Sequence, residues 1–215
     1  MIVRSTNISA PKTVVWKGKE EQTGIFKKPV EGGIYLGNTD VVDDAVVDRK
    51  YHGGVDKACY LFSADVYEEW QGKFPDADWS LGMFGENLTV AGLDERTIYI
   101  GDHYQVGEAL VEVSEPREPC YKLGIRFGTQ AVLKPFINQP HCGVYVRVLK
   151  QGKVMTGDKL RRVKRVQKDF SMARIYWLRY HAMQEDIPEI HRALGVDSLA
   201  ASAKRGLRKR LAFLV

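Results

Sequence analysis

The chain has 215 residues, of which 44% are hydrophobic and 27% are charged, as in ordinary soluble globular proteins. No apolar run approaches the roughly 20 residues that span a bilayer, and the N-terminus lacks the basic and apolar regions of a signal peptide. We therefore expect a cytoplasmic protein with no membrane contact. Three cysteines without a C-x-x-C pair favour free thiols in a reducing compartment rather than a disulfide framework.

The first three quarters of the chain are predicted to be mostly β. Short segments rich in Val, Ile and Tyr alternate with Gly and Asp turns. The expected strands cover residues 13–17, 33–36, 45–48, 58–62, 87–90, 97–100, 104–106, 109–114 and 144–149. Residues 64–74 and 130–137 have helical spacing instead. Many short strands at this spacing are typical of a closed barrel.

The last quarter of the chain differs in charge and in pattern. Residues 1–158 hold 18 Lys and Arg against 22 Asp and Glu, a net of −4, whereas residues 159–215 hold 14 against 5, a net of +9. Three helices are expected, the first capped by Ser171, the second with Pro188 near its start, and the third capped by Asp197 or Ser198.

The predicted fold is therefore mainly β (α+β). We expect a closed β-barrel domain at residues 1–160, followed by a small C-terminal three-helix bundle at residues 161–215. The charge shift at the boundary suggests that the helical unit is separate and is not needed for ligand binding by the barrel.

The most informative segment is SEPREPCYKL, residues 114–123. A β run ends in two prolines that stiffen the chain, and the thiol of Cys120 follows at once. Arg117, Lys122 and Arg126 place positive charge nearby, which favours the thiolate, the form that binds soft metals. A buried cysteine beside solvated basic residues fits the same pattern equally well. Cys59 and Cys142 lack this context and are interpreted as core thiols.

This segment, followed by RFG at 126–128, resembles the signature of the YiiM-like branch of the MOSC (molybdenum cofactor sulfurase C-terminal) domain family. Four further segments match in the same order. They are GIFKKPV at 24–30, HGGVDKA at 52–58, FGENLT at 84–89 and GVYVRV at 143–148. The match spans about residues 1–160, and the tail resembles the three-helix extension of many members. Residues 40–50 depart from the branch's usual Gly-rich, acidic stretch.

The resemblance implies a MOSC β-barrel in which Cys120 coordinates the metal of molybdenum cofactor and is catalytic. It also implies reduction of N-hydroxylated compounds such as hydroxylaminopurines to amines. Electrons would come from an external flavin or iron–sulfur reductase, because the chain has no flavin motif and no iron–sulfur cysteine cluster. His52 is the candidate proton donor, and Asp56 is its candidate orienting group.

The cofactor-binding residues expected from the resemblance are basic side chains and one amide. They are Lys27, Lys57, Asn87, Arg117, Lys122 and Arg126. Each has a plainer interpretation: Lys27 as a solvated lysine before a Lys-Pro pair, Asp56 with Lys57 as a solvated ion pair, and Asn87 as a turn residue that bonds its own backbone.

Two other classes of function stay open. In the first, Cys120 carries a persulfide and the protein is a sulfur carrier for cofactor or metal–sulfur maturation. In the second, the basic cluster at residues 204–210 binds nucleic acid, but it lacks the interleaved aromatic residues that stack on bases. A solvated helix face is therefore favoured over a docking surface for nucleic acid or for an acidic electron-transfer partner.

Overall fold

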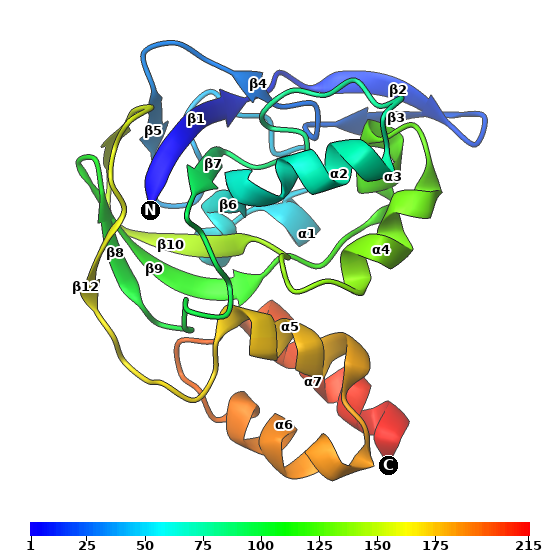
Figure 1. Cartoon of the computed structure of the whole chain (residues 1–215), viewed down its shortest axis with the longest axis vertical. Helices are drawn as coiled ribbons and strands as arrows, with labels where there is room; N and C mark the ends of the chain where they lie inside the picture. The colour runs from blue at the N-terminus through cyan, green and yellow to red at the C-terminus, as the bar shows by residue number, and fades with distance from the viewer.

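The computed structural model describes the backbone of residues 1–215 and all side chains except those of residues 50 and 51 (Figure 1). Eight strands of the described chain form one mixed sheet in the order β12-β8-β9-β10-β6-β7-β1-β4, and two short strand pairs, β2–β3 and β5–β11, lie beside it. The strands are β1 Ile2–Ile8, β2 Lys12–Trp16, β3 Lys19–Thr23, β4 Lys28–Pro29, β5 Ile34–Leu36, β6 Cys59–Ser63, β7 Leu88–Ala91, β8 His103–Val106, β9 Ala109–Pro116, β10 Val144–Lys150, β11 Gly152–Val154 and β12 Arg161–Lys164.

The helices follow the apolar periodicity of the sequence where they are long enough to show one. The α-helices are α1 Arg49–His52, α2 Tyr67–Lys73, α3 Tyr121–Arg126, α4 Leu133–Ile137, α5 Met172–His181, α6 Ile187–Leu194 and α7 Ala201–Leu214. Single 3-10 turns cover Val55–Lys57, Ala64–Val66, Gln130–Val132 and Gln184–Asp186. Ser171 caps α5 as predicted, its Oγ accepting from the Arg174 amide at 3.2 Å. The described chain contains no helix of the length and apolarity that a membrane span requires.

The prediction of a closed barrel is wrong. The edge strands β12 and β4 do not pair with each other in the described chain, so the sheet is open and the fold is α+β. The β4 edge has only two residues and ends in Pro29, which has no N–H to extend a ladder. Backbone hydrogen bonds from Val3 to Asp158 and from Leu160 to Met1 join the chain before β12 to β1 without forming a strand pair that closes the ring.

Two predicted strands are also absent from the described chain. Residues 45–48 have no partner strand and line a pocket instead. Residues 97–100 make only an isolated bridge, between Tyr99 and Ser171. Both segments carry β-branched or aromatic residues, but strand propensity without a pairing neighbour does not make a strand.

The C-terminal helices do not form the predicted self-contained bundle. α5 packs against β9 of the sheet as well as against α7, while α6 packs on α7 (Figure 1). Ile175 and Leu178 of α5 and Leu207 of α7 belong to the same continuous hydrophobic core as the sheet. α5 therefore buries its apolar face partly against β9 and partly against α7. The proposed boundary at residues 160 and 161 stays a prediction, although β12 carries the sheet to Lys164.

Candidate functional site

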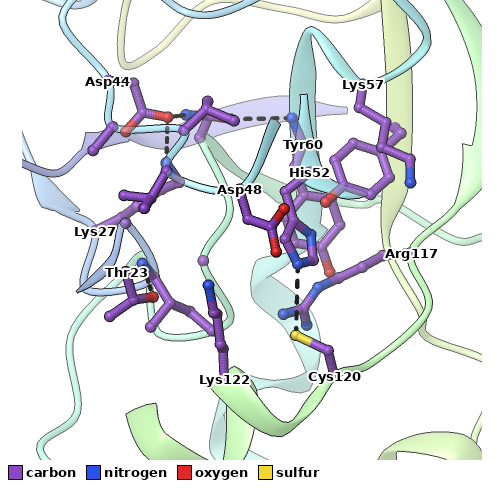
Figure 2. A pocket seen from close by; sticks show the side chains of 18 of the residues that line it. Thr23, Lys27, Asp44, Asp48, His52, Lys57, Tyr60, Arg117, Cys120 and Lys122 are labelled. Atoms are coloured by element: carbon purple, nitrogen blue, oxygen red, sulfur yellow. Dashed lines mark hydrogen bonds and ion pairs between the residues drawn. The ribbon is translucent and has the colours of Figure 1, made fainter. Parts of the chain in front are cut away.

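A pocket opens between the end of β9, helix α1 and the segments around residues 23–27 and 44–48 (Figure 2). It encloses about 660 Å³ with its open mouth included. Its walls bring together most of the residues that the sequence singled out. The predicted site residues in the lining are Lys27, His52, Lys57, Asn87, Arg117, Cys120 and Lys122.

Cys120 lies at one end of this pocket, just ahead of helix α3, and is partly exposed. The rigid Pro116–Pro119 stretch ends β9 and turns the chain, so the thiol faces the pocket. Its Sγ is 3.7 Å from Nε2 of His52, which α1 presents from the opposite wall (Figure 2). Burial, together with the charges of Arg117 and Lys57, lowers the pKa of His52 from 6.5 to about 4, so the imidazole is neutral at pH 7.

Arg117 is 5% exposed, and its guanidinium lies beside Cys120 and His52 (Figure 2). The guanidinium carbon is 5.3 Å from the ring centre of Tyr60 and 5.6 Å from that of Phe136. Nη1 is buried without a hydrogen-bond partner in the described part of the structure. A buried donor without a partner is costly, so a hydrogen-bond acceptor placed beside Nη1 would be stabilised there.

Lys27 and Asn87 lie on the pocket wall away from the thiol, and both bind Asp44. The Lys27 ammonium pairs with Asp44, whose carboxylate also accepts from Asn87 Nδ2 at 2.9 Å and from the Ser9 amide at 3.0 Å. The side-chain Oδ1 of Asn87 accepts a hydrogen bond from the backbone N–H of Tyr60 at 3.2 Å. These contacts give both predicted cofactor ligands a structural role within the protein.

The other predicted residues separate into two groups. Lys57 and Lys122 face the pocket, Lys57 with Nζ 3.6 Å from Glu115 and Lys122 with Nζ 3.4 Å from the Gln22 carbonyl. Asp56 does not contact His52: it binds Arg147 at 2.6 Å, on the far side of the turn. Arg126 lies outside the pocket, in a separate groove with Phe26 and Asp78.

Sequence reasoning missed several pocket residues. Asp44 and Asp48 come from the segment 40–50 that departs from the family pattern, and Tyr60 and Tyr145 come from strands whose apolar runs read as core. Asp48 lies next to the His52 ring (Figure 2), where its charge opposes the fall in the pKa of His52. No local motif distinguishes these residues from ordinary turn and strand residues.

Cys59 and Cys142 are fully buried, as predicted, and burial raises the pKa of both thiols strongly. Among the described side chains, no group of three or more His, Cys, Asp or Glu could hold a metal ion unaided.

The chain is a MOSC-domain protein: the MOSC domain family profile matches residues 48–161, and the chain belongs to that family. It is 35% identical to the uncharacterized protein YflK of Bacillus subtilis, over 97% of this chain and 93% of that protein. It is 33% identical to the protein YiiM of Escherichia coli, over 87% and 84%.

Solved structures agree with this assignment. The crystal structure of YiiM from Geobacillus stearothermophilus superposes with a TM-score of 0.81 at 29% identity and covers 98% of both chains. YiiM from Escherichia coli gives a TM-score of 0.75 at 27% identity, over 99% of this chain and 94% of that one. A protein named reductase from Gibberella moniliformis is 32% identical over 74% of this chain, which is 28% of its own length.

Proposed function

We propose that this chain is an oxidoreductase that binds molybdenum cofactor in the Cys120 pocket and reduces N-hydroxylated compounds to amines. The observation that carries the proposal is a partly exposed thiol facing a pocket in which Nη1 of the buried Arg117 lacks a hydrogen-bond partner. Membership of the MOSC family and the likeness to a protein named reductase support the reaction class.

The residues present fit such a cofactor by the chemistry of their donor atoms. A thiolate is a soft ligand, suited to a metal already held by sulfur. Arg117 and Lys122 are cations beside the thiol and suit an anionic group. When bound, the cofactor would supply the two-electron redox chemistry of the reaction.

The protein's own residues would bind, orient and exchange protons. The reaction R–NHOH + 2 e⁻ + 2 H⁺ → R–NH₂ + H₂O needs two protons, delivered beside the thiol. His52 is the titratable side chain placed to relay them, since its Nε2 faces Cys120. With a pKa of about 4 it works as a neutral imidazole that passes a proton on, and it does not store one at pH 7. The electrons would come from an external reductase of flavin or iron–sulfur type.

The test is metal and pterin analysis of protein made with molybdate supplied, combined with reduction of a hydroxylaminopurine by a chemical reductant. Wild-type protein should hold molybdenum and pterin in equal amounts, and Cys120→Ser should lose both the metal and the activity because serine is a hard, poorly ionised ligand. Cys59→Ser is the matched control and should keep them. Wild-type protein with cyanide-labile sulfur and no pterin would support the sulfur-carrier alternative and refute this proposal.

A further inference from the structure

The two carboxylates that flank Arg117, those of Glu115 and Glu118, are not among the residues that line the pocket, and both bind the C-terminal helices. Glu118 accepts from Arg179 of α5 through two bonds, Nε to Oε1 at 3.0 Å and Nη2 to Oε2 at 3.3 Å, and it lies 3.5 Å from the Tyr180 hydroxyl. Glu115 accepts from the Ser202 hydroxyl of α7 at 2.7 and 2.8 Å.

These contacts lie on either side of Arg117 in the chain, and both precede Cys120. Glu118 is two residues before Cys120, and Glu115 is two residues before Arg117. The Ala200 amide, at the start of α7, donates to the Ser114 carbonyl at 3.1 Å. The C-terminal helices thus bind segment 114–120 at Ser114, Glu115 and Glu118, while the Cys120 thiol and the Arg117 guanidinium face the pocket.

A glycine in the middle of α7 makes room for the Arg179–Glu118 pair. A Cβ on Gly206 would come within 2.7 Å of both Arg179 Nε and Glu118 Oε1. Glycine inside a helix is unfavourable relative to alanine. At this buried position, the absence of a side chain leaves room for the Arg179–Glu118 ion pair to lie against the helix.

We infer that Arg179 is a positioning residue: through Glu118 it fixes the loop that carries Cys120, and the C-terminal helices are part of the functional site. This inference opposes the expectation that residues 159–215 are dispensable for cofactor binding. It rests on the proposed role of Cys120 as the functional thiol, but it concerns the order of the loop, which can be measured without the cofactor.

The chain offers a matched control on the same helix. Arg174 of α5 pairs with Glu189 and Asp186, both within the helical region, and is 34% exposed against 24% for Arg179. Part-exposed ion pairs contribute little to global stability, so either arginine can be replaced without unfolding the chain. Of the two variants, we expect only Arg179→Met to loosen segment 114–120, which carries Cys120.

The experiment measures the rate at which iodoacetamide alkylates Cys120 in full-length, metal-free protein, together with amide hydrogen exchange of residues 117–123. Cys59 and Cys142 are fully buried and serve as internal unreactive thiols. Arg179→Met should raise the alkylation rate about fivefold, which is about 1 kcal/mol at 1.4 kcal/mol per factor of ten, and should lower the protection of these amides. Arg179→Lys should restore part of the wild-type value.

Gly206→Ala provides a second route that keeps the arginine. The added methyl would lie 2.7 Å from Arg179 Nε and from Glu118 Oε1, and 2.9 Å from Arg179 Cδ, so the ion pair must shift, while alanine favours the helix. It should raise Cys120 reactivity at an unchanged or higher melting temperature, which a loss of global stability would not do. Equal alkylation rates in Arg179→Met, Arg174→Met and wild type would overturn the inference, and so would equal increases in both arginine variants. Absence of molybdenum from the wild-type protein would instead overturn the proposed function and leave this result standing.

Discussion

Replacing Lys27 by methionine tests whether this lysine serves the protein or a ligand. Its ammonium pairs with Asp44 in a buried contact, with side-chain exposures of 8% and 3%. Removing one partner of a buried ion pair costs about 3–5 kcal/mol, because the other charge stays buried without compensation.

The structure places the expected loss at the lower end of that range. After Lys27→Met, the Asp44 carboxylate still accepts from Asn87 at 2.9 Å and from the Ser9 amide at 3.0 Å, so it keeps two of three donors. We expect a loss of about 3 kcal/mol in the free energy of unfolding, or roughly 6–12 °C in melting temperature for a chain of this size.

The assay is urea unfolding of the cofactor-free protein, with Lys28→Met as the control. Lys28 is the next residue and is exposed, so its replacement should change the free energy by no more than about 0.5 kcal/mol. The double variant Lys27→Met/Asp44→Asn should lose less than the sum of the single changes, since each removes the same pair. A loss below about 1 kcal/mol in Lys27→Met would refute the structural role and favour the expected role of Lys27 as a cofactor-binding cation.

Three further outcomes follow from particular contacts. The hydrogen bond to Glu95 raises the pKa of His141, so this pair stabilises the folded state fully below about pH 6.5. That stabilisation is lost as pH rises through the folded pKa of His141. His141→Gln should therefore remove this loss of stability from unfolding curves taken between pH 6 and 9. Burial lowers the pKa of His52 to about 4, so this histidine costs stability as pH falls from 6.5 towards 4, and His52→Gln should flatten the acid limb. Lys122→Gln should weaken retention of molybdenum, measured by metal analysis after gel filtration, whereas Arg126→Gln should not, because Arg126 lies outside the pocket.

The cysteine and its basic neighbours could be found from sequence because they are adjacent in the chain. Cys120, Arg117 and Lys122 fall within six residues, and a short stiff segment keeps such residues together in any fold. His52 was found through a separate motif, and the structure brings its ring to the thiol across 68 positions.

The partners of these residues could not be predicted, because they are set by tertiary contacts. Asp56 belongs to the same motif as His52, yet it lies in a 3-10 turn and its carboxylate binds Arg147, 91 residues away in the chain. Arg179 carries no local sign that it binds Glu118. The change in composition near residue 160 wrongly indicated a separate helical unit. The charged residues lie on the exposed faces of the helices, whereas buried residues of the helices belong to the same hydrophobic core as the sheet.

Alternation of apolar residues likewise located most strands but not the closure of the sheet. A period of two shows which residues of a strand face the core, and it contains nothing about which strands are neighbours. Closure depends on the length and hydrogen-bonding capacity of the edge strands. Here the edge strand β4 has two residues and ends at Pro29, and its place at the edge of the sheet is seen only in the folded structure.

The charges of the pocket are distributed unevenly, and this bears on how a ligand would lie in it. Lys27 is matched by Asp44, and Lys57 by Glu115, so both lysines carry compensated charge. Among the described ion pairs, neither Arg117 nor Lys122 has a carboxylate partner, and both lie at the end that holds Cys120. A thiolate and the sulfur and oxygen ligands of a metal bring negative charge to one place, and two uncompensated cations beside them offset that charge in a partly dry site. The Cys120 end is therefore where an anionic metal centre gains most, and the end lined by Lys27, Asp44 and Asn87 is where a neutral, hydrogen-bonding part of a ligand fits best.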